Sequence, residues 1–222
     1  MDVRDETRAA VLPSRTIGEA WLDVADRILR LGVPATWDGR PTSELRTVML
    51  EVAEPRPDDV LIARFADPER LAWMHANFTD FTRVRALGDA ASYASRLYDY
   101  LRTGRDQVQW VIERLAADPT RRDVVITTLE PTLDSSYIPC VSLLDLWIPD
   151  GRLELVVTAH SIDFGTKGYA NLVELADLQH RVAEALQVPV GRLLMSVKSA
   201  HVYDTEIDAM RATCSARDRD PQ

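Results

Sequence analysis

Two hydrophobic periodicities alternate along the first part of the chain. Apolar residues spaced three and four positions apart predict an amphipathic helix over residues 15–32, with a glycine as its stop signal. Residues 43–54 instead alternate apolar and polar side chains, as a strand does when mainly one of its faces is buried. Helical spacing and N-terminal capping residues also predict helices in the segments 67–78, 89–102 and 105–119.

The second part of the chain is richer in strands. β-branched and apolar residues predict strands over 121–131, 140–149, 152–161 and 190–204, and a Pro-Asp-Gly turn joins the middle two. A long helix with apolar residues at helical spacing, 169–187, precedes the last strand. This order of elements, closed by one more helix, predicts a single α+β domain over the whole chain, with a mixed β-sheet covered on one side by helices.

Composition and charge narrow the classes of function. With 222 residues, of which 46% are hydrophobic, the chain can bury a sizeable core. A formal net charge of -9 argues against a nucleic acid polymer as partner, because binding a polyanion requires a cationic surface. No segment approaches the roughly 20 apolar residues that cross a bilayer, and the N-terminal sequence has no signal-peptide design. We therefore expect a soluble protein of the cytoplasm that does not bind membranes.

A few polar residues at predicted strand ends and turns are candidates for chemistry. Arg121 and Arg122 could clamp a phosphate, and the turn before the long helix places Ser161 and Lys167 near a helix N-terminus, where anions bind. Each observation has an ordinary alternative, since adjacent arginines usually mark a solvated strand start and an isolated cysteine such as Cys140 is usually a small buried residue. With only two cysteines and no Cys/His cluster, we expect neither a disulfide framework nor a metal site.

The order and spacing of these motifs resemble the thymidylate synthase family, which also contains the deoxycytidylate and cytidylate hydroxymethylases. The matching segments are "PTRRDVV", "IPCVSLL", "AHSID", "YANLVEL" and "SAHVYD", and their register extends from Pro119 to Asp208. Agreement over several motifs at once is more specific than any single motif. Two weaker matches lie upstream, where "SYASRL" is similar to a Tyr-Gly-x-Arg segment and "GRPTSEL" to a phosphate-binding arginine region. The chain is thereby identified as a divergent, short member of this family.

The resemblance implies a fold and a reaction. The fold would be thymidylate-synthase-like, with a homodimer that packs sheet against sheet. The reaction would transfer a one-carbon unit from 5,10-methylenetetrahydrofolate to C5 of a pyrimidine nucleoside monophosphate, as a methyl or a hydroxymethyl group. By resemblance, Cys140 is the nucleophile that adds to C6 of the pyrimidine. A nearby cation such as Arg122 would favour its thiolate, and covalent addition divides one difficult step into easier ones.

The same resemblance assigns further residues to the site. Asn171 matches the amide that reads the pyrimidine edge and favours uracil, and Asp163 matches a catalytic residue that positions the base and the folate. His201 and Tyr203 match the pair that binds the sugar hydroxyl, and Tyr93 falls in the segment similar to Tyr-Gly-x-Arg. Phosphate contacts are assigned to Arg40, Arg121, Arg122, His160 and Ser161. The adjacent arginines of this set would reach the nucleotide held by the partner subunit.

Several departures from the family pattern change the expected activity. His160 replaces an arginine, which makes one phosphate-binding charge dependent on pH, and Val141 replaces a histidine after the nucleophile. The register set by Trp73 places Arg70 where the family carries its general-base glutamate, so the neighbouring Glu69 is the candidate catalytic base. We therefore expect little activity on standard deoxyuridylate. Two alternatives stay open: a protein that binds a nucleotide without one-carbon transfer, and an enzyme with folate-independent chemistry at C5.

Overall fold

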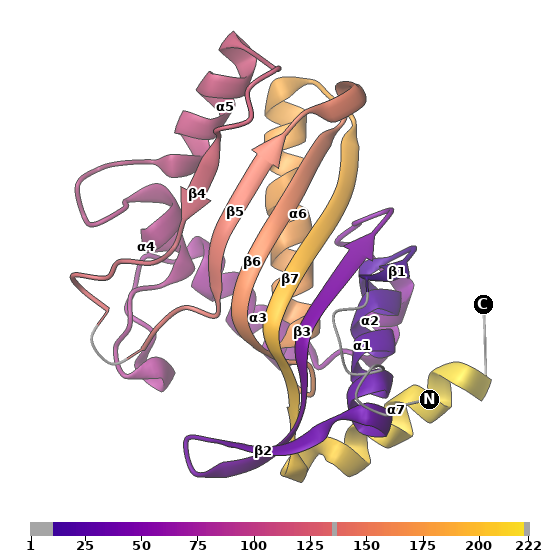
Figure 1. Ribbon diagram of the computed structural model, residues 1–222. Coiled ribbons are helices and arrows are strands. Elements are labelled where there is room, and N and C mark those ends of the chain that lie inside the picture. Colours follow the sequence, from indigo (N-terminus) through magenta and orange to yellow (C-terminus); the bar gives the residue numbers. More distant parts are fainter. Residues whose placement is uncertain (1–10, 135–136, 220–222) are drawn as a thin grey trace.

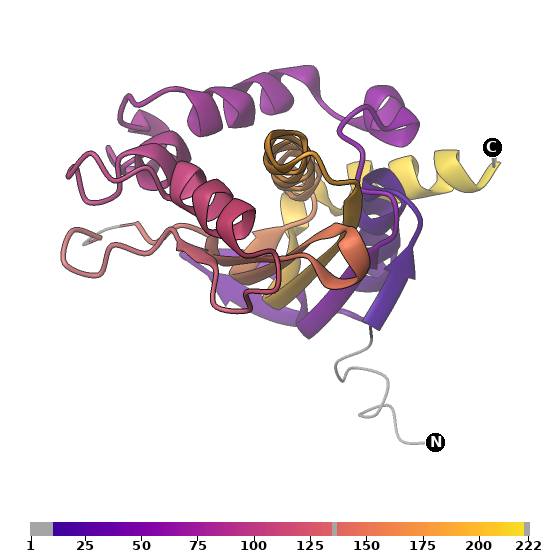
Figure 2. The same cartoon turned by 90° about the horizontal axis from the view of Figure 1, so that it is seen from above.

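One mixed β-sheet organises the structure, and helices cover one of its faces (Figure 1 and Figure 2). The computed structural model describes residues 11–134 and 137–219. The strands are β1 (Val11–Ser14), β2 (Val33–Trp37), β3 (Arg40–Val52), β4 (Val125–Thr127), β5 (Val141–Trp147), β6 (Leu153–Asp163) and β7 (Val190–Tyr203). The α-helices are α1 (Ile17–Leu31), α2 (Val60–Phe65), α3 (Pro68–Thr79), α4 (Tyr93–Tyr98), α5 (Gln107–Ala117), α6 (Gly168–Leu186) and α7 (Ile207–Arg219). Short 3₁₀ turns are η1 (Arg85–Leu87), η2 (Pro149–Gly151) and η3 (Asp204–Glu206).

The strand order of the sheet combines parallel and antiparallel pairs. Within the described residues, the order is β1-β3-β7-β6-β5-β4, and β2 pairs with β3 beside this path. β6 is parallel to β7, and α6 forms the crossover between them on the covered face. β1 is also parallel to β3, whereas the other pairs are antiparallel. The sheet confirms the predicted α+β class, the mixed pairing and the helices on one side.

Helix α6 lies across the covered face and is buried over most of its surface. Leu172, Leu175, Leu178 and Val182 are each at most 1% exposed. The sheet, α1, α3 and α5 surround the helix, so more than one of its sides meets apolar neighbours. This burial explains why the segment is rich in leucine and valine beyond a single stripe. Among the described helices, including α6, none has both the length and the apolar character needed to cross a membrane.

Local signals fix where the helices near the site begin. Thr16 and Glu19 form a reciprocal capping box at the start of α1, and Asp67 caps the first turn of α3. Trp21 of α1 is 2% exposed and donates its indole N–H to the Phe164 carbonyl at 2.8 Å. This hydrogen bond ties α1 to the turn between β6 and α6, where several predicted site residues gather.

The structure corrects the extent of several predicted elements. β1, β2 and α2 were absent from the prediction, because each has only four to six residues and no clear period. The helix predicted over 89–102 is confined to Tyr93–Tyr98, since Leu101 and Arg102 adopt positive φ values in the turn that follows. The strand predicted over 121–131 is likewise confined to the three residues of β4.

Strand β3 departs from the alternation that predicts it. Thr47 has a φ of 59°, in the left-handed region that a β-branched residue rarely adopts. Leu45 before it and Val48 after it are both buried, although a regular strand would place them on opposite faces. The sequence pattern contains no sign of this interruption, because Thr47 is an ordinary strand residue by propensity.

The second face of the sheet carries no helix within the described residues (Figure 2). We call it the open face. Several apolar side chains of this face are partly or largely exposed, among them Val11 and Met49 at 53% and 38%. Val156 and Leu194, which are paired in register, are also partly exposed there. The open face is therefore a partly apolar surface.

Candidate active site

Strand ends bring many of the predicted site residues to one edge of the sheet. Strand pairing places the C-terminal ends of β6 and β7 beside the starts of β3 and β5. In this register Asp163 lies beside His201, and the His160 N–H donates to the Cys140 carbonyl at 3.0 Å. The predicted residues collected at this edge are Arg40, Cys140, His160, Ser161, Asp163, His201 and Tyr203.

Cys140 is the partly buried residue that precedes β5. Its Sγ lies 3.6 Å from the Tyr137 hydroxyl, a hydrogen bond in which either atom can donate. The next backbone N–H, that of Val141, donates to the Tyr93 hydroxyl at 3.0 Å. Burial raises the pKa of the Cys140 thiol, while the hydrogen bond to Tyr137 and the positive charge of Lys167 act in the opposite direction. The thiol thus has both a hydrogen-bond partner and a cation that can stabilise its thiolate.

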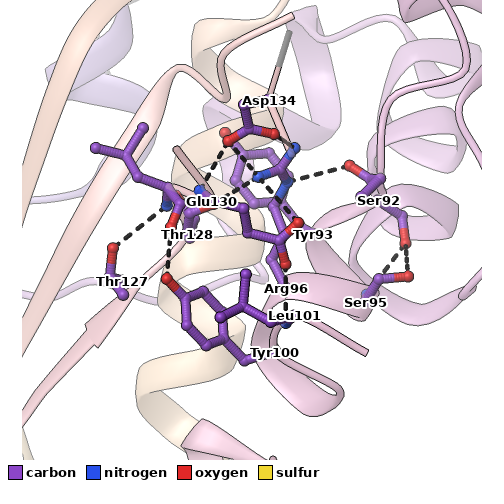
Figure 3. Close-up of polar contacts among 12 residues, drawn as sticks. Ser92, Tyr93, Ser95, Arg96, Tyr100, Leu101, Thr127, Thr128, Glu130 and Asp134 are labelled. Atoms are coloured by element: carbon purple, nitrogen blue, oxygen red, sulfur yellow. Dashed lines mark hydrogen bonds and ion pairs between the residues drawn. The ribbon is translucent and has the colours of Figure 1, made fainter. Parts of the chain in front are cut away.

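A buried ionic network holds the segment that leads to Cys140 (Figure 3). The guanidinium of Arg96, 1% exposed, makes two hydrogen bonds to Asp134 at 2.7 and 3.0 Å. It also lies 3.9 Å from the Glu130 carboxylate and donates to the Thr128 carbonyl at 2.7 Å. Because Arg96 belongs to α4, the network joins this helix to the segment between β4 and β5. It thereby limits the movement of the chain segment that precedes Cys140.

Tyr93, on the same helix, is held from two sides. Its backbone N–H donates to the Asn77 side-chain oxygen at 3.0 Å, and its ring stacks on Phe78 with centroids 4.5 Å apart. Burial raises the pKa of the Tyr93 phenol above its ordinary value, so the hydroxyl stays protonated at neutral pH. Tyr93 therefore presents a neutral hydroxyl next to the backbone that follows Cys140, and its role in substrate binding stays a prediction.

Asp163 closes the turn from which α6 begins. Its Oδ1 accepts from the N–H groups of Gly165 and Thr166 at 2.9 and 3.4 Å, and its Oδ2 accepts from the Thr166 hydroxyl at 2.6 Å. Asn171, 5% exposed in the first turn of α6, donates its side-chain amide to the Lys167 carbonyl at 3.0 Å. The Lys167 N–H in turn donates to the Asp163 carbonyl at 3.1 Å. These contacts fix Asp163, Lys167 and Asn171 relative to one another.

The end of β7 carries a cluster of aromatic and charged side chains. His201 meets Tyr203 edge-on with ring centroids 5.1 Å apart, and the Arg40 guanidinium lies 3.7 Å from the centroid of the Tyr203 ring. The Ser161 hydroxyl is 3.4 Å from Nδ1 of His201. Burial lowers the pKa of His201, so the imidazole is neutral at neutral pH and can both donate and accept. Burial also raises the pKa of Glu206, in η3, to about 7.

His160 occupies the position where the resemblance expects an arginine. It is partly buried, and this burial together with the charge of Lys198 lowers the pKa of His160 below its ordinary value. At neutral pH the side chain is therefore uncharged. It can offer a phosphate a hydrogen bond, and it gains a full charge only in acid.

Three predicted site residues lie away from this edge. Because β4 is antiparallel to β5, Arg121 and Arg122, which precede β4, lie at the end of β5 opposite to Cys140. Within the described part of one chain, Lys167 is a cation whose charge acts on the thiol, and the effect of Arg122 on Cys140 stays a prediction. Glu69 is exposed in the first turn of α3, and its role as general base stays a prediction.

Sequence reasoning missed three residues of this region. Arg96 stood in the segment similar to Tyr-Gly-x-Arg, but only the tyrosine was assigned a place in the site. Tyr137 precedes Cys140 by three positions, a spacing that has no meaning outside a helix. Glu206 follows the end of β7, and no sequence pattern marks it, because its raised pKa depends on burial beside residues of β3 and β6 that are distant in sequence.

Comparison with known proteins gives the family. A family model described as "Thymidylate synthase" matches residues 58–222. The chain belongs to the thymidylate synthase family. One relative, a "Putative thymidylate synthase" of Methanococcoides burtonii, is 28% identical over 213 residues, which cover 92% of this chain and 94% of that protein. A protein of the same description from Methanosarcina acetivorans is 29% identical over 206 residues, covering 89% and 91%.

A shorter match extends to a bacterial relative of the thymidylate synthase family. The thymidylate synthase of Staphylococcus haemolyticus is 29% identical over 118 residues, which are 52% of this chain and 37% of that protein. The family named on the basis of the motifs is therefore confirmed. Most of the predicted residues at the sheet edge lie within the part of the chain that the family model matches.

Proposed function

We propose that this member of the thymidylate synthase family transfers a one-carbon unit to C5 of a pyrimidine nucleoside monophosphate. The observation that carries the proposal is the position of Cys140, at the sheet edge that also holds Asp163, His201 and Tyr203. Lys167 supplies a positive charge near the thiol. A nucleophile, a carboxylate and hydrogen-bonding groups for a sugar thus share one region. The product is a methylated or a hydroxymethylated nucleotide, and the geometry is compatible with both.

Cys140 acts on the pyrimidine ring. As its thiolate adds to C6, an Sγ–C6 bond forms, the electrons of the C5–C6 double bond move toward O4, and C5 becomes nucleophilic. The positive charge of Lys167 and the hydroxyl of Tyr137 favour the thiolate before this step. Asn171 offers a donor and an acceptor to the base edge, which suits uracil.

The turn at Asp163 suits a folate cofactor. A carboxylate has about four lone-pair sites, and the hydrogen bonds from Gly165 and Thr166 occupy three of them. The remaining site on Oδ2 can accept an N–H group of a pterin ring. When bound there, 5,10-methylenetetrahydrofolate supplies the one-carbon unit.

The proposal includes a homodimer that packs sheet against sheet and works in the cytoplasm. The open face supplies apolar side chains that a partner could cover, such as Met49, which is exposed, and Leu194, which is partly exposed. Arg121 and Arg122 lie far from Cys140 of the same chain, as expected of residues that bind the phosphate in the partner's site. Light scattering coupled to size exclusion tests this point, and a monomer at micromolar concentration would contradict it.

A second candidate function is nucleotide binding without turnover. It is favoured by Arg70, which stands at the position of the family's glutamate, and by the exposure of Glu69 beside it. Folate-independent chemistry at C5, such as dehalogenation or proton exchange, would use the same Cys140. Release of tritium from C5-labelled nucleotides without any folate would favour this third possibility, and no release under any condition would favour binding alone.

Covalent trapping tests the proposal directly. A 5-fluoropyrimidine nucleotide blocks the loss of the C5 substituent, so the enzyme, the nucleotide and methylenetetrahydrofolate should form a stable adduct on the peptide that contains Cys140. We expect Cys140→Ser to abolish the adduct and Cys214→Ser, the matched control at the other free cysteine, to retain it. Intact mass spectrometry measures both, with the ribose and the deoxyribose forms of 5-fluorouridine monophosphate. Absence of any adduct on wild-type protein would contradict one-carbon transfer at this site.

A further inference from the structure

The cluster at the end of β7 contains a carboxyl group to which the proposed function gives no role. Glu206 follows Tyr203 by three positions, within η3. Its Oε1 lies 4.0 Å from the Arg40 guanidinium, which itself lies 3.7 Å from the centroid of the Tyr203 ring. The side chain of Glu206 is 22% exposed. Glu206 therefore borders the residues to which sugar binding is assigned.

Two atoms of this cluster are buried without a hydrogen-bond partner among the described residues. They are Nε2 of His201 and Oε2 of Glu206. The other ring nitrogen of His201 faces the Ser161 hydroxyl at 3.4 Å, so Nε2 is the one that remains free. Buried polar atoms are almost always hydrogen-bonded in native proteins. His201 is paired in register with Asp163, and Oε2 of Glu206 and Oδ1 of Asp163 border the same point above Gly165, so both unpartnered atoms belong to the surroundings of Asp163 and are available to a ligand there.

The backbone at Gly165 leaves room for the free oxygen of Glu206. A Cβ at this position would lie 2.5 Å from Oε2 of Glu206 and 3.2 Å from Oδ1 of Asp163. Both carboxyl groups therefore border the same small space above the Gly165 backbone. Any residue other than glycine would force the Glu206 side chain to move.

Charged groups of both signs surround Glu206. Burial raises the pKa of Glu206 to about 7, and the negative charge of Asp163, at the end of β6, acts in the same direction. Arg40 of β3 and Lys167 before α6 act against this rise. Near neutral pH a large fraction of the molecules carries a protonated Glu206, which can donate a hydrogen bond as well as accept one.

We propose that His201 and Glu206 bind two neighbouring hydroxyl groups of the sugar, so that the site selects a ribonucleotide over a deoxyribonucleotide. The inference rests on the proposed nucleotide substrate and specifies its class. A ribose presents two adjacent hydroxyls that each donate and accept, whereas a deoxyribose presents one and leaves one of the two protein atoms unpaired. Arg40, 53% exposed, lies 4.0 Å from Oε1 of Glu206, so it has room to turn toward a phosphate and release the Glu206 carboxyl for a sugar hydroxyl.

Calorimetric titration of the full chain with UMP, dUMP, CMP and dCMP tests the inference. We expect the wild-type protein to bind the ribonucleotide of its preferred base at least about tenfold more tightly than the deoxyribonucleotide. Glu206→Ala should remove this preference by weakening ribonucleotide binding alone. Glu206→Gln keeps the side-chain length, an acceptor oxygen and a donor group, so it should retain most of the preference for the ribonucleotide. Asp204→Asn, which changes an exposed carboxylate of the same turn, is the matched control and should change nothing.

The outcomes separate the inference from the function on which it rests. Equal wild-type affinity for ribonucleotides and deoxyribonucleotides overturns the inference and leaves the proposed function intact. The same holds if the preference survives in a Glu206→Ala protein. If the wild-type protein binds none of the four nucleotides, the proposed function fails and the inference fails with it. Circular dichroism of each variant verifies that the compared proteins are folded.

Discussion

Replacing Glu206 by glutamine is expected to remove a pH dependence from the folding stability of this protein. The carboxyl has a pKa of 4.5 as its ordinary value and of about 7 in the folded chain, chiefly because of its burial and then because of Asp163. The folded state therefore binds this proton more tightly than the unfolded state does. The resulting stabilisation is fully present below pH 4.5 and is lost as the pH rises toward 7.

The size of this effect follows from the difference between the two pKa values. A rise from 4.5 to about 7 corresponds to about 3 kcal/mol of unfolding free energy, most of which is lost between about pH 5 and pH 7. The Glu206 side chain is only 22% exposed, so solvent screens the charge of its carboxylate weakly. Glutamine does not titrate, so its contribution is constant with pH.

Urea unfolding followed by tryptophan fluorescence measures the effect in wild-type, Glu206→Gln and Asp204→Asn proteins across this pH range. The free energy of wild-type minus that of Glu206→Gln should fall by about 2 to 3 kcal/mol as the pH rises. Titrating groups far from Glu206 contribute equally in both proteins and cancel in this difference. The corresponding difference for Asp204→Asn should stay nearly flat. If the unfolding free energy of wild type minus that of Glu206→Gln stays constant or increases as the pH rises, the reasoning is refuted.

Three further predictions concern the contacts around the site. Gly165→Ala should lower the unfolding free energy by about 1 to 3 kcal/mol in urea unfolding, because the added Cβ would lie 2.5 Å from the Glu206 carboxyl. In a double-mutant cycle, truncation of Glu206 to alanine should recover much of this loss. Tyr137→Phe should slow the alkylation of Cys140 near neutral pH, because the lost hydrogen bond raises the pKa of the thiol, and an unchanged pH profile would contradict this. Arg96→Lys should lower the unfolding free energy by about 3 kcal/mol, since an ammonium group cannot make both buried hydrogen bonds of the guanidinium to Asp134. A loss below about 0.5 kcal/mol would show that the network contributes little to stability.

The motif spacing predicted a common site that the strand register supports. Cys140, Asp163 and His201 are well separated in sequence, yet the pairing of β5, β6 and β7 brings them to one edge of the sheet. Within one chain, a positive charge that acts on the thiol comes from Lys167, which the motifs did not indicate, while the role of Arg122 stays a prediction. The two residues carry the same charge, and a sequence does not state the distance from either to the sulfur.

By itself, the sequence determined the elements that have a strong period and a clear boundary, such as α1 and α6. Burial of one or more helix faces requires apolar residues at fixed spacing, so the requirement is written along the chain. Only the tertiary structure decided that Arg96 meets Asp134, and that Glu206 and Asp163 border the space above Gly165. These contacts join elements distant in sequence. Their energies depend on distance and burial, which no local pattern of residue types records.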